Sequence, residues 1–377
     1  MSAGERGRLG DVLLGAVGSL GLDLPPEPAA RMSSARARLG LPAATKACVV
    51  LVDGLGGHNL DQRSGSAPFL TGADRVGSVR TTFPSTTATN VTYLGTGWEG
   101  GRTRMLGYSV RAAPRAVVNL VSWNGPAVPE QWQAETTVFE HLEQAGRTAV
   151  SVGPWRFADS GLTRAAWRGG EYAAAESLRE RVDTAVAELR DPDVDVVYLY
   201  WGELDSHGHR HGWQSPGWEE LLAVTDAELD RLARLLPPGT LLLVTADHGM
   251  VDVAAHERID LAGREDLTRD VDLVAGEPRA VHLYCAPGSA NAVAGRYRAA
   301  LGEQAQVLTR AEVIDSGMIG PTTPAAAPVV GDVVVAARGN QAVMDSRSQS
   351  AASLALVGMH GGVTDAETLV PLVVVQG

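Results

Sequence analysis

The sequence predicts an α/β fold, namely a doubly wound, mostly parallel sheet flanked by helices, with a smaller inserted lobe. Two observations support this prediction. Short apolar runs rich in β-branched residues recur along the 377-residue chain, and they alternate with longer stretches of helical periodicity. The runs are continuously apolar, as in strands that are buried on both faces. A chain of this length can form one large sheet with insertions.

Five apolar runs are expected to be buried parallel strands: 47–52, 148–152, 194–200, 240–245 and 370–375. Three stretches are expected to be helices: 135–145, 173–189 and 216–236. In the last of these, Trp218, Leu222 and Leu229 share one face after a Ser-Pro start. The segment from about 256 to 350 is less regular, so we expect a smaller lobe or cap there.

Composition narrows the class of partner. The net charge is -12 and no basic stripe offsets it, so neither a nucleic-acid polymer nor an anionic membrane surface is expected as a partner. No apolar run approaches twenty residues, so no membrane span is expected. A small anionic substrate stays possible if a metal ion meets it. The oligomeric state is left open.

The N-terminus and the cysteines favour a cytoplasmic location. The first 28 residues contain a short apolar stretch, but they also carry acidic residues and no small-residue cleavage site, unlike a signal peptide. Cys48 and Cys285 lie far apart in the sequence. Neither a disulfide scaffold nor a zinc knuckle is therefore expected.

Acidic and imidazole side chains stand beside four of the predicted strands. They are Asp53 in VDGLG, Asp205 and His209 in DSHGH, Asp247 and His248 in ADHGM, and His360 in GMHGG. Taken singly, an Asp at a strand end is often a turn former or a helix cap, and alternating His residues can form a solvated loop. Together they favour a metal site, because the carboxyl ends of parallel strands converge on one crevice.

The types of ligand indicate the metal and the chemistry. Three Asp and three His with no thiolate suit Zn²⁺, with Mn²⁺ or Fe²⁺ as alternatives. Six ligands are enough for two ions. Two divalent ions about 4 Å apart can hold the attacking and leaving oxygens of a displacement at phosphorus.

The stretch FPSTTATNVTYLGTG, residues 83–97, contains one Ser and five Thr. Most of these hydroxyls have a structural interpretation, as the caps of a turn and of the helix that follows it. One of them can instead be a nucleophile.

With these motifs in this order, the sequence resembles the alkaline phosphatase superfamily, and within it the nucleotide pyrophosphatase/phosphodiesterase branch. The resemblance covers about residues 46–377, which it implies to be an alkaline phosphatase-like catalytic domain with a possible cap or insertion within 256–350. Residues 1–45 are then an N-terminal extension that packs on this domain. The resemblance implies two metal sites: Asp205, His209 and His360 for one ion, and Asp53, Asp247 and His248 for the other.

The resemblance also implies a Thr nucleophile, with an Asn three residues later and a Thr-Gly pair nine residues later. Thr87 meets both spacings, through Asn90 and Thr96. Thr82 matches the local TFP spelling of some members, but it misses the spacing to Thr-Gly. Thr87 also lies at an expected helix N-terminus, where backbone N–H groups and the helix dipole favour a phosphoryl oxygen.

Candidate substrate contacts are Asn90, Tyr108 and Arg279. Phosphodiesterase members usually carry an Asn that holds a phosphoryl oxygen, and Tyr108 stands at that position here. Tyr108 can donate its phenolic hydrogen, Asn119 or Asn124 can reach in, or Tyr108 can pack in the core. Arg279 can contact an anionic group, although a strand-edge Arg is more often a solvated surface residue.

The expected function is hydrolysis of phosphodiester or pyrophosphate bonds in small nucleotide-type molecules, through a covalent phosphothreonine at Thr87. A phosphomonoesterase or phosphonate hydrolase on the same site is the alternative, and a non-catalytic metal-dependent binding protein is a third. The active-site motifs contribute no Arg or Lys to meet the extra charge of a monoester dianion. A diester is therefore the expected substrate.

Overall fold

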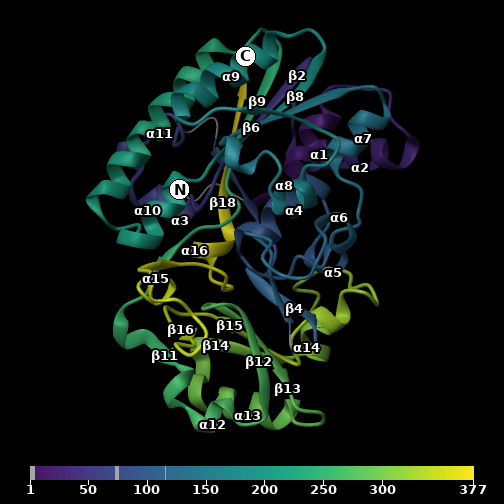
Figure 1. Cartoon of the computed structure of the whole chain (residues 1–377). Coiled ribbons are helices and arrows are strands. Elements are labelled where there is room, and N and C mark those ends of the chain that lie inside the picture. Colours follow the sequence, from purple (N-terminus) through teal and green to yellow (C-terminus); the bar gives the residue numbers. More distant parts are fainter. Residues whose placement is uncertain (1–4, 73–75, 115) are drawn as a thin grey trace.

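An eight-stranded sheet forms the centre of the computed structural model, which describes residues 5–72, 76–114 and 116–377 (Figure 1). Its strands are β1 (Glu5–Arg8), β2 (Lys46–Val52), β3 (Val76–Arg80), β6 (Thr148–Gly153), β7 (Glu171–Ala174), β8 (Val194–Trp201), β9 (Thr240–Thr245) and β18 (Leu369–Gln376). Their order across the sheet is β1-β3-β18-β9-β2-β8-β6-β7. The predicted fold class, a mostly parallel sheet flanked by helices, is confirmed.

The last apolar run departs from the prediction, because β18 is antiparallel to both of its neighbours, β3 and β9. The helix α16 (Asp365–Thr368) leads directly into β18 from the edge of the sheet where the other strands end. The chain therefore enters the sheet at that edge without a crossover, and the strand must run in the opposite direction. A continuous apolar run shows burial on both faces and carries no information about strand direction.

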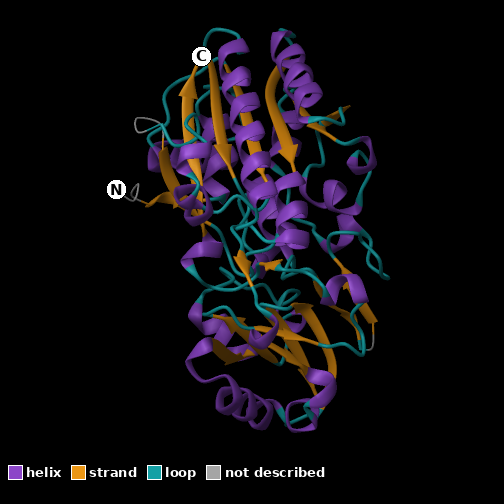
Figure 2. Ribbon diagram, turned by 90° about the vertical axis from the view of Figure 1, so that its left-hand side faces the viewer, coloured by secondary structure: helices purple, strands orange, loops and turns teal. Residues whose placement is uncertain are grey.

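Helices cover both faces of the sheet, as Figures 1 and 2 show. One group is α1 (Gly10–Gly18), α2 (Pro26–Leu39), α4 (Thr87–Thr96), α7 (Val138–Gln144) and α8 (Gly161–Ala166). The other group is α3 (Gly57–Gln62), α9 (Leu178–Arg190), α10 (Glu203–His211) and α11 (Pro216–Leu235). Between the two groups, β2 and β9 are buried almost throughout. Trp218, Leu222 and Leu229 of α11 are buried as expected.

The helix predicted over 173–189 begins later than expected. Residues up to Ala174 belong to the edge strand β7, and the helix α9 starts after Ser177. The Ser177 hydroxyl accepts the Glu180 N–H, and the Glu180 carboxylate accepts the Ser177 N–H, which is a capping box. This cap fixes the helix start.

Residues before the first predicted strand also belong to the sheet layer. The strand β1 pairs with β3 in parallel, and the helix α1 is buried along nearly its whole length. The division at residue 45 stays a prediction. No helix in the described part of the chain is long and apolar enough to cross a membrane.

A smaller lobe lies beyond the carboxyl edge of the parallel strands, at the bottom of Figure 1. Its antiparallel sheet has the order β12-β13-β15-β14, with strands β12 (Val271–Glu277), β13 (Ala280–Cys285), β14 (Ala305–Thr309) and β15 (Val333–Ala337). Its helices are α12 (Glu265–Thr268), α13 (Ala290–Leu301) and α14 (Arg310–Ser316). The lobe has its own apolar core, which includes Val281, Tyr297 and Val335.

Short elements connect the lobe to the main sheet. Three two-stranded ladders are β4 (Ser109–Ala113) with β5 (Ala116–Asn119), β10 (Val251–Asp252) with β17 (Gly358–Met359), and β11 (Arg258–Asp260) with β16 (Ala342–Met344). The short helices are α5 (Gly100–Thr103), α6 (Pro129–Trp132) and α15 (Ala351–Leu354). The ladder of β10 and β17 holds the segment before His360 next to the segment that follows β9.

Candidate metal centre

The ends of three parallel strands carry most of the acidic and imidazole side chains of the site. Asp53 follows β2, and Asp247 and His248 follow β9. The helix α10 begins two residues after β8, and its Asp205 and His209 are one helical turn apart on one face. Gly54 has a φ of 75°, and a Cβ there would lie 3.0 Å from the Asp205 backbone. The chain therefore needs glycine where these two strand ends meet.

Asp53, Asp247 and His248 form the first triad, and all three are buried. One ligand atom of each lies within 4.8 Å of the others. The Nε2 atom of His248 is 3.3 Å from Oδ1 of Asp53 and 3.6 Å from Oδ2 of Asp247. This spacing allows all three atoms to bind one ion.

Asp205, His209 and His360 form the second triad. The Oδ1 atom of Asp205 is 3.4 Å from Nε2 of His209 and 3.9 Å from Nε2 of His360. The two triads adjoin, because the rings of His248 and His360 stack with their centroids 3.6 Å apart. The six predicted ligand side chains therefore meet as two neighbouring groups of three.

Buried carboxyl groups gather in the two triads, and part of their hydrogen-bonding capacity is unused. Oδ1 of Asp53, Oδ1 of Asp205 and Oδ2 of Asp247 are buried and accept no hydrogen bond. Burial, together with the neighbouring Asp53, raises the pKa of Asp247 well above its usual value. Burial disfavours a charged His248, but the carboxylates of Asp247 and Asp53 outweigh it and raise its pKa to about 10. Buried carboxylate oxygens that accept no hydrogen bond are costly, and divalent cations would stabilise them, so the residues present fit two metal ions.

Backbone carbonyls orient the three imidazole rings. The Nδ1 atoms of His209, His248 and His360 lie 2.8, 3.1 and 3.0 Å from the carbonyl oxygens of Gly358, Gly249 and Ser85. In each ring Nε2 is therefore the nitrogen that faces the triads. Second contacts of this kind are typical of metal-binding His residues.

Tyr200 supports the first triad, and this role of Tyr200 was not predicted from the sequence. Its hydroxyl donates a hydrogen bond to Oδ2 of Asp53 at 2.6 Å. Tyr198 and Tyr200 lie two residues apart in β8, and this pair in a mostly apolar strand was the available signal.

The variant Tyr200→Phe is expected to weaken metal binding by about 10- to 100-fold, because Asp53 loses the hydrogen bond that orients it. Competition with a zinc-binding dye measures this affinity. Tyr172→Phe is the matched control, since the Tyr172 hydroxyl donates only to the Pro154 carbonyl. Equal affinities in the two variants would contradict the role given to Tyr200.

Thr87 begins the helix α4 beside the first triad. Its Oγ1 lies 3.2 Å from Nε2 of His248, and Thr86 is the residue that precedes the helix in an extended conformation. Thr82 is buried, and its hydroxyl has no hydrogen-bond partner. Of the two threonines that the sequence offered, Thr87 is therefore the one in contact with a candidate ligand.

The structure gives Asn90, a predicted substrate contact, a position inside the protein. The side chain is fully buried. Its Oδ1 accepts the Thr82 N–H at 2.9 Å, and its Nδ2 donates to the carbonyls of Thr82 and Pro84 at 3.2 and 3.1 Å. Asn90 thus holds the turn in front of Thr87 in place.

Arg279, another predicted substrate contact, is also engaged within the protein. Its guanidinium is fully buried and forms a two-bond ion pair with Glu367, at 2.6 and 2.7 Å. The remaining donors bind the carbonyls of Gln341 and Gly339. Arg279 lies in the smaller lobe and Glu367 in α16, so the pair joins the lobe to the main sheet.

The variant Glu367→Ala is expected to lower the free energy of unfolding by about 3–5 kcal/mol, because it leaves the buried Arg279 charge without a partner. Denaturant unfolding measures this change. Asp266→Ala is the control, because it breaks an exposed ion pair with Arg264 and should change stability far less. Similar midpoints for the two variants would rule out a structural role for the buried pair.

Tyr108 is the predicted contact that does lie near the triads. It is 46% exposed and lines the same cavity as His209 and His360. Asn119 uses its side-chain oxygen to accept the N–H groups of Val121 and Ser122, and Asn124 is exposed.

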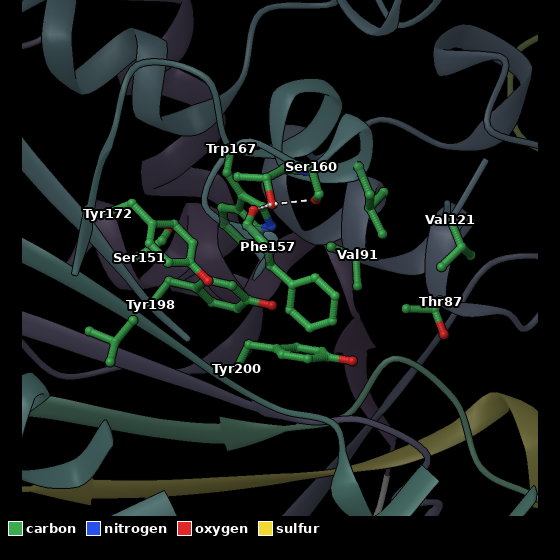
Figure 3. A pocket seen from close by; sticks show the side chains of 13 residues that line it. Thr87, Val91, Val121, Ser151, Phe157, Ser160, Trp167, Tyr172, Tyr198 and Tyr200 are labelled. Atoms are coloured by element: carbon green, nitrogen blue, oxygen red, sulfur yellow. Dashed lines mark hydrogen bonds between the residues drawn. The ribbon is translucent and has the colours of Figure 1, made fainter. Parts of the chain in front are cut away.

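Two cavities flank the centre. The larger, of about 680 Å³, lies between the triads and the smaller lobe and is lined by Thr86, Tyr108, Glu277, His209 and His360 among others. The smaller is an aromatic pocket behind Thr87, lined by Phe157, Trp167, Tyr172, Tyr198 and Tyr200 among others. Figure 3 shows Thr87 at one end of this pocket and Tyr172 and Trp167 toward the other. Neither cavity has a Lys or Arg among its lining residues in the described part of the chain.

Comparisons with known proteins agree with this architecture. A sequence model of the family described as Type I phosphodiesterase / nucleotide pyrophosphatase matches residues 47–363. Human ectonucleotide pyrophosphatase/phosphodiesterase family member 7 is 38% identical over 87 residues, which are 22% of this chain and 19% of that protein. Phosphopentomutase of Rhizobium meliloti is 34% identical over 121 residues, 30% of this chain and 27% of that protein. The aligned segments thus span about a fifth to a quarter of these relatives.

Solved structures match over much more of the chain. Murine ectonucleotide pyrophosphatase/phosphodiesterase 5, in complex with AMP, superimposes with a TM-score of 0.68 at 18% identity, covering 88% of this chain and 87% of that one. Phosphonoacetate hydrolase from Sinorhizobium meliloti 1021, in complex with phosphonoformate, gives 0.67 at 19% identity, covering 87% and 89%. At these identities the likeness shows the fold.

Proposed function

Because the chain belongs to the Type I phosphodiesterase / nucleotide pyrophosphatase family, we propose that it is a two-metal hydrolase of small nucleotide-type phosphodiesters. The observation that carries the proposal is the position of Thr87, whose hydroxyl lies 3.2 Å from His248 at the start of α4 and beside two adjoining triads. A candidate nucleophile, candidate metal ligands and a helix N-terminus thus lie together, which supports the proposal.

Each group has a role in this proposal. Thr87 Oγ attacks phosphorus, and a phosphothreonine forms and is then hydrolysed. The N-terminal turn of α4 offers unpaired backbone N–H groups and a positive dipole end to the phosphoryl oxygens. Metal ions, with zinc fitting the donor set best, would lower the pKa of the Thr87 hydroxyl and stabilise charge on the leaving oxygen.

The aromatic pocket behind Thr87 supports a nucleoside as the group that stays on phosphorus. Phe157 and Tyr200 meet edge to face with ring centroids 5.8 Å apart, and Trp167 stacks on Tyr198 at 3.8 Å. Aromatic walls suit a flat base, which can stack on them. In murine ectonucleotide pyrophosphatase/phosphodiesterase 5, a protein of the same fold, the bound ligand is AMP.

A preference for diesters over monoesters follows from the charges. A monoester dianion needs an additional cation, whereas Arg279 is fully engaged with Glu367 and Arg210 is exposed and donates to the Ser206 carbonyl. The zinc-loaded protein is expected to cleave bis-p-nitrophenyl phosphate with a kcat/KM about tenfold or more above that for p-nitrophenyl phosphate, a factor that corresponds to about 1.4 kcal/mol. Preference for the monoester would replace this proposal with a phosphomonoesterase. No turnover of either ester would favour a binding protein.

A further inference from the structure

The larger cavity contains a buried carboxyl group that the proposed reaction does not use. Glu277, at the end of β12, is 7% exposed and lines the cavity together with His209 and His360. Its Oε2 accepts the Tyr108 backbone N–H, and its Oε1 has no hydrogen-bond partner. The group thus keeps one unused acceptor.

Two glycines make room for this carboxyl group. Gly107 and Gly361 have φ values of 131° and 118°, which side chains rarely adopt. A Cβ on Gly361 would lie 2.7 Å from Glu277 Cγ, and one on Gly107 would lie 3.2 Å from Oε2. Gly361 directly follows the candidate ligand His360, so the backbone holds Glu277 beside the second triad.

No positive side chain of the cavity wall balances Glu277. The lining residues of the described chain include no Lys or Arg, and the other acidic one, Asp345, is already paired with Arg347 at 2.7 Å. Burial raises the pKa of Glu277 to about 8. Divalent ions in the neighbouring triads would favour its ionised form, because nearby positive charge lowers the pKa of a carboxyl group.

We propose that this cavity receives the leaving group, and that Glu277 makes the protein select a leaving alcohol with hydrogen-bond donors or positive charge over a phosphate or pyrophosphate. The inference rests on the proposed function. As the bond from Thr87 Oγ to phosphorus forms, the bond from phosphorus to the leaving oxygen breaks. The Thr87 proton passes to water, and the leaving oxygen keeps the electron pair and takes a proton from water.

The geometry of displacement connects the leaving group to Glu277. The attacking Thr87 lies against His248 of the first triad, so an in-line displacement directs the leaving oxygen toward the second triad. Two ligands of that triad, His209 and His360, line the larger cavity. A phosphate leaving group would lie beside a carboxylate, and no Lys or Arg among the described lining residues would offset the repulsion. A leaving alcohol with a hydroxyl group would instead donate to the free acceptor, and one with a positive charge would pair with the carboxylate.

The test uses substrates that share the adenosine 5′-phosphoryl group, so that AMP is the common product. One is the choline ester of AMP, and the other is ATP, cleaved at its α-phosphorus. The zinc-loaded protein and Glu277→Gln are assayed by chromatography of AMP at pH 9, above the pKa of Glu277. Gln keeps an acceptor for the Tyr108 N–H. Comparing the two proteins cancels the intrinsic reactivity of each substrate.

The ratio of kcat/KM for ATP to that for the choline ester is expected to rise by about tenfold or more in Glu277→Gln. Glu303→Gln, an exposed site in the same lobe, should leave it unchanged. Ser348→Lys adds a cation at an exposed position of the cavity wall without altering the buried carboxyl group, and it should also raise the ratio. Cleavage of both substrates with a ratio that neither variant changes would overturn the inference and leave the proposed function standing. No cleavage of any diester would remove both.

Discussion

Thr87→Ala is expected to lower kcat for a phosphodiester by about four orders of magnitude or more, because it removes the attacking oxygen and with it the covalent route. KM should change less, since the triads, the larger cavity and the aromatic side chains of the smaller pocket are untouched. Steady-state kinetics on bis-p-nitrophenyl phosphate measure the loss. Acid quenching of the unaltered protein during turnover should trap a p-nitrophenyl phosphoryl group on the peptide that contains Thr87, and mass spectrometry detects it.

Neighbouring threonines supply the controls. Thr82→Ala removes a hydroxyl that has no hydrogen-bond partner, and Thr86→Ala removes one that does not cap α4. Both variants should keep most of the activity. Even the loss of a side chain that caps a helix lowers the free energy of unfolding by only about 1 kcal/mol. If Thr82→Ala were the inactive variant instead, Thr82 would be the nucleophile, and the spacing to Thr96 would not identify it.

The metal-ligand candidates were accessible from the sequence because a general rule of topology places them. Buried apolar runs reveal parallel strands, and parallel strands end at one edge of the sheet, so Asp53, Asp205 and Asp247 had to lie close together. The match of the family model to residues 47–363 confirms the resemblance that these motifs suggested. The direction of β18 was not accessible, because its apolar pattern is the same in either orientation.

The surroundings of the candidate substrate contacts were not accessible from the sequence either, for a different reason. The roles of Asn90 and Arg279 depend on which hydrogen-bond partners surround them, and those partners are known only in the folded chain. Arg279 meets Glu367, 88 residues away in sequence, and Asn90 meets carbonyl oxygens of the preceding turn. Glu277 lacks a motif altogether, since its position against Gly107 and Gly361 arises from the packing of the lobe against the main sheet.

Removal of metal is the second change with a large expected effect. Elemental analysis of the purified protein is expected to find two divalent ions per chain, with zinc as the main metal. Exhaustive chelation is expected to abolish turnover. The reason lies in the buried acceptors Asp53 Oδ1, Asp205 Oδ1 and Asp247 Oδ2, which accept no hydrogen bond from the described residues. Chelation should also lower the Tm, because an ion at about 100 times its Kd stabilises the folded state by about 2.7 kcal/mol.

Variants of single ligands separate the two triads. His209→Ala alters the second triad alone, so one ion per chain should remain, bound by Asp53, Asp247 and His248. Turnover should still be lost, since the leaving oxygen then has no stabilising charge, while the Thr87 hydroxyl keeps its place 3.2 Å from His248. Zinc added back to the chelated, unaltered protein should restore activity, and zinc added to His209→Ala should not. Full activity after chelation, with no transition metal found, would refute a metal-dependent mechanism.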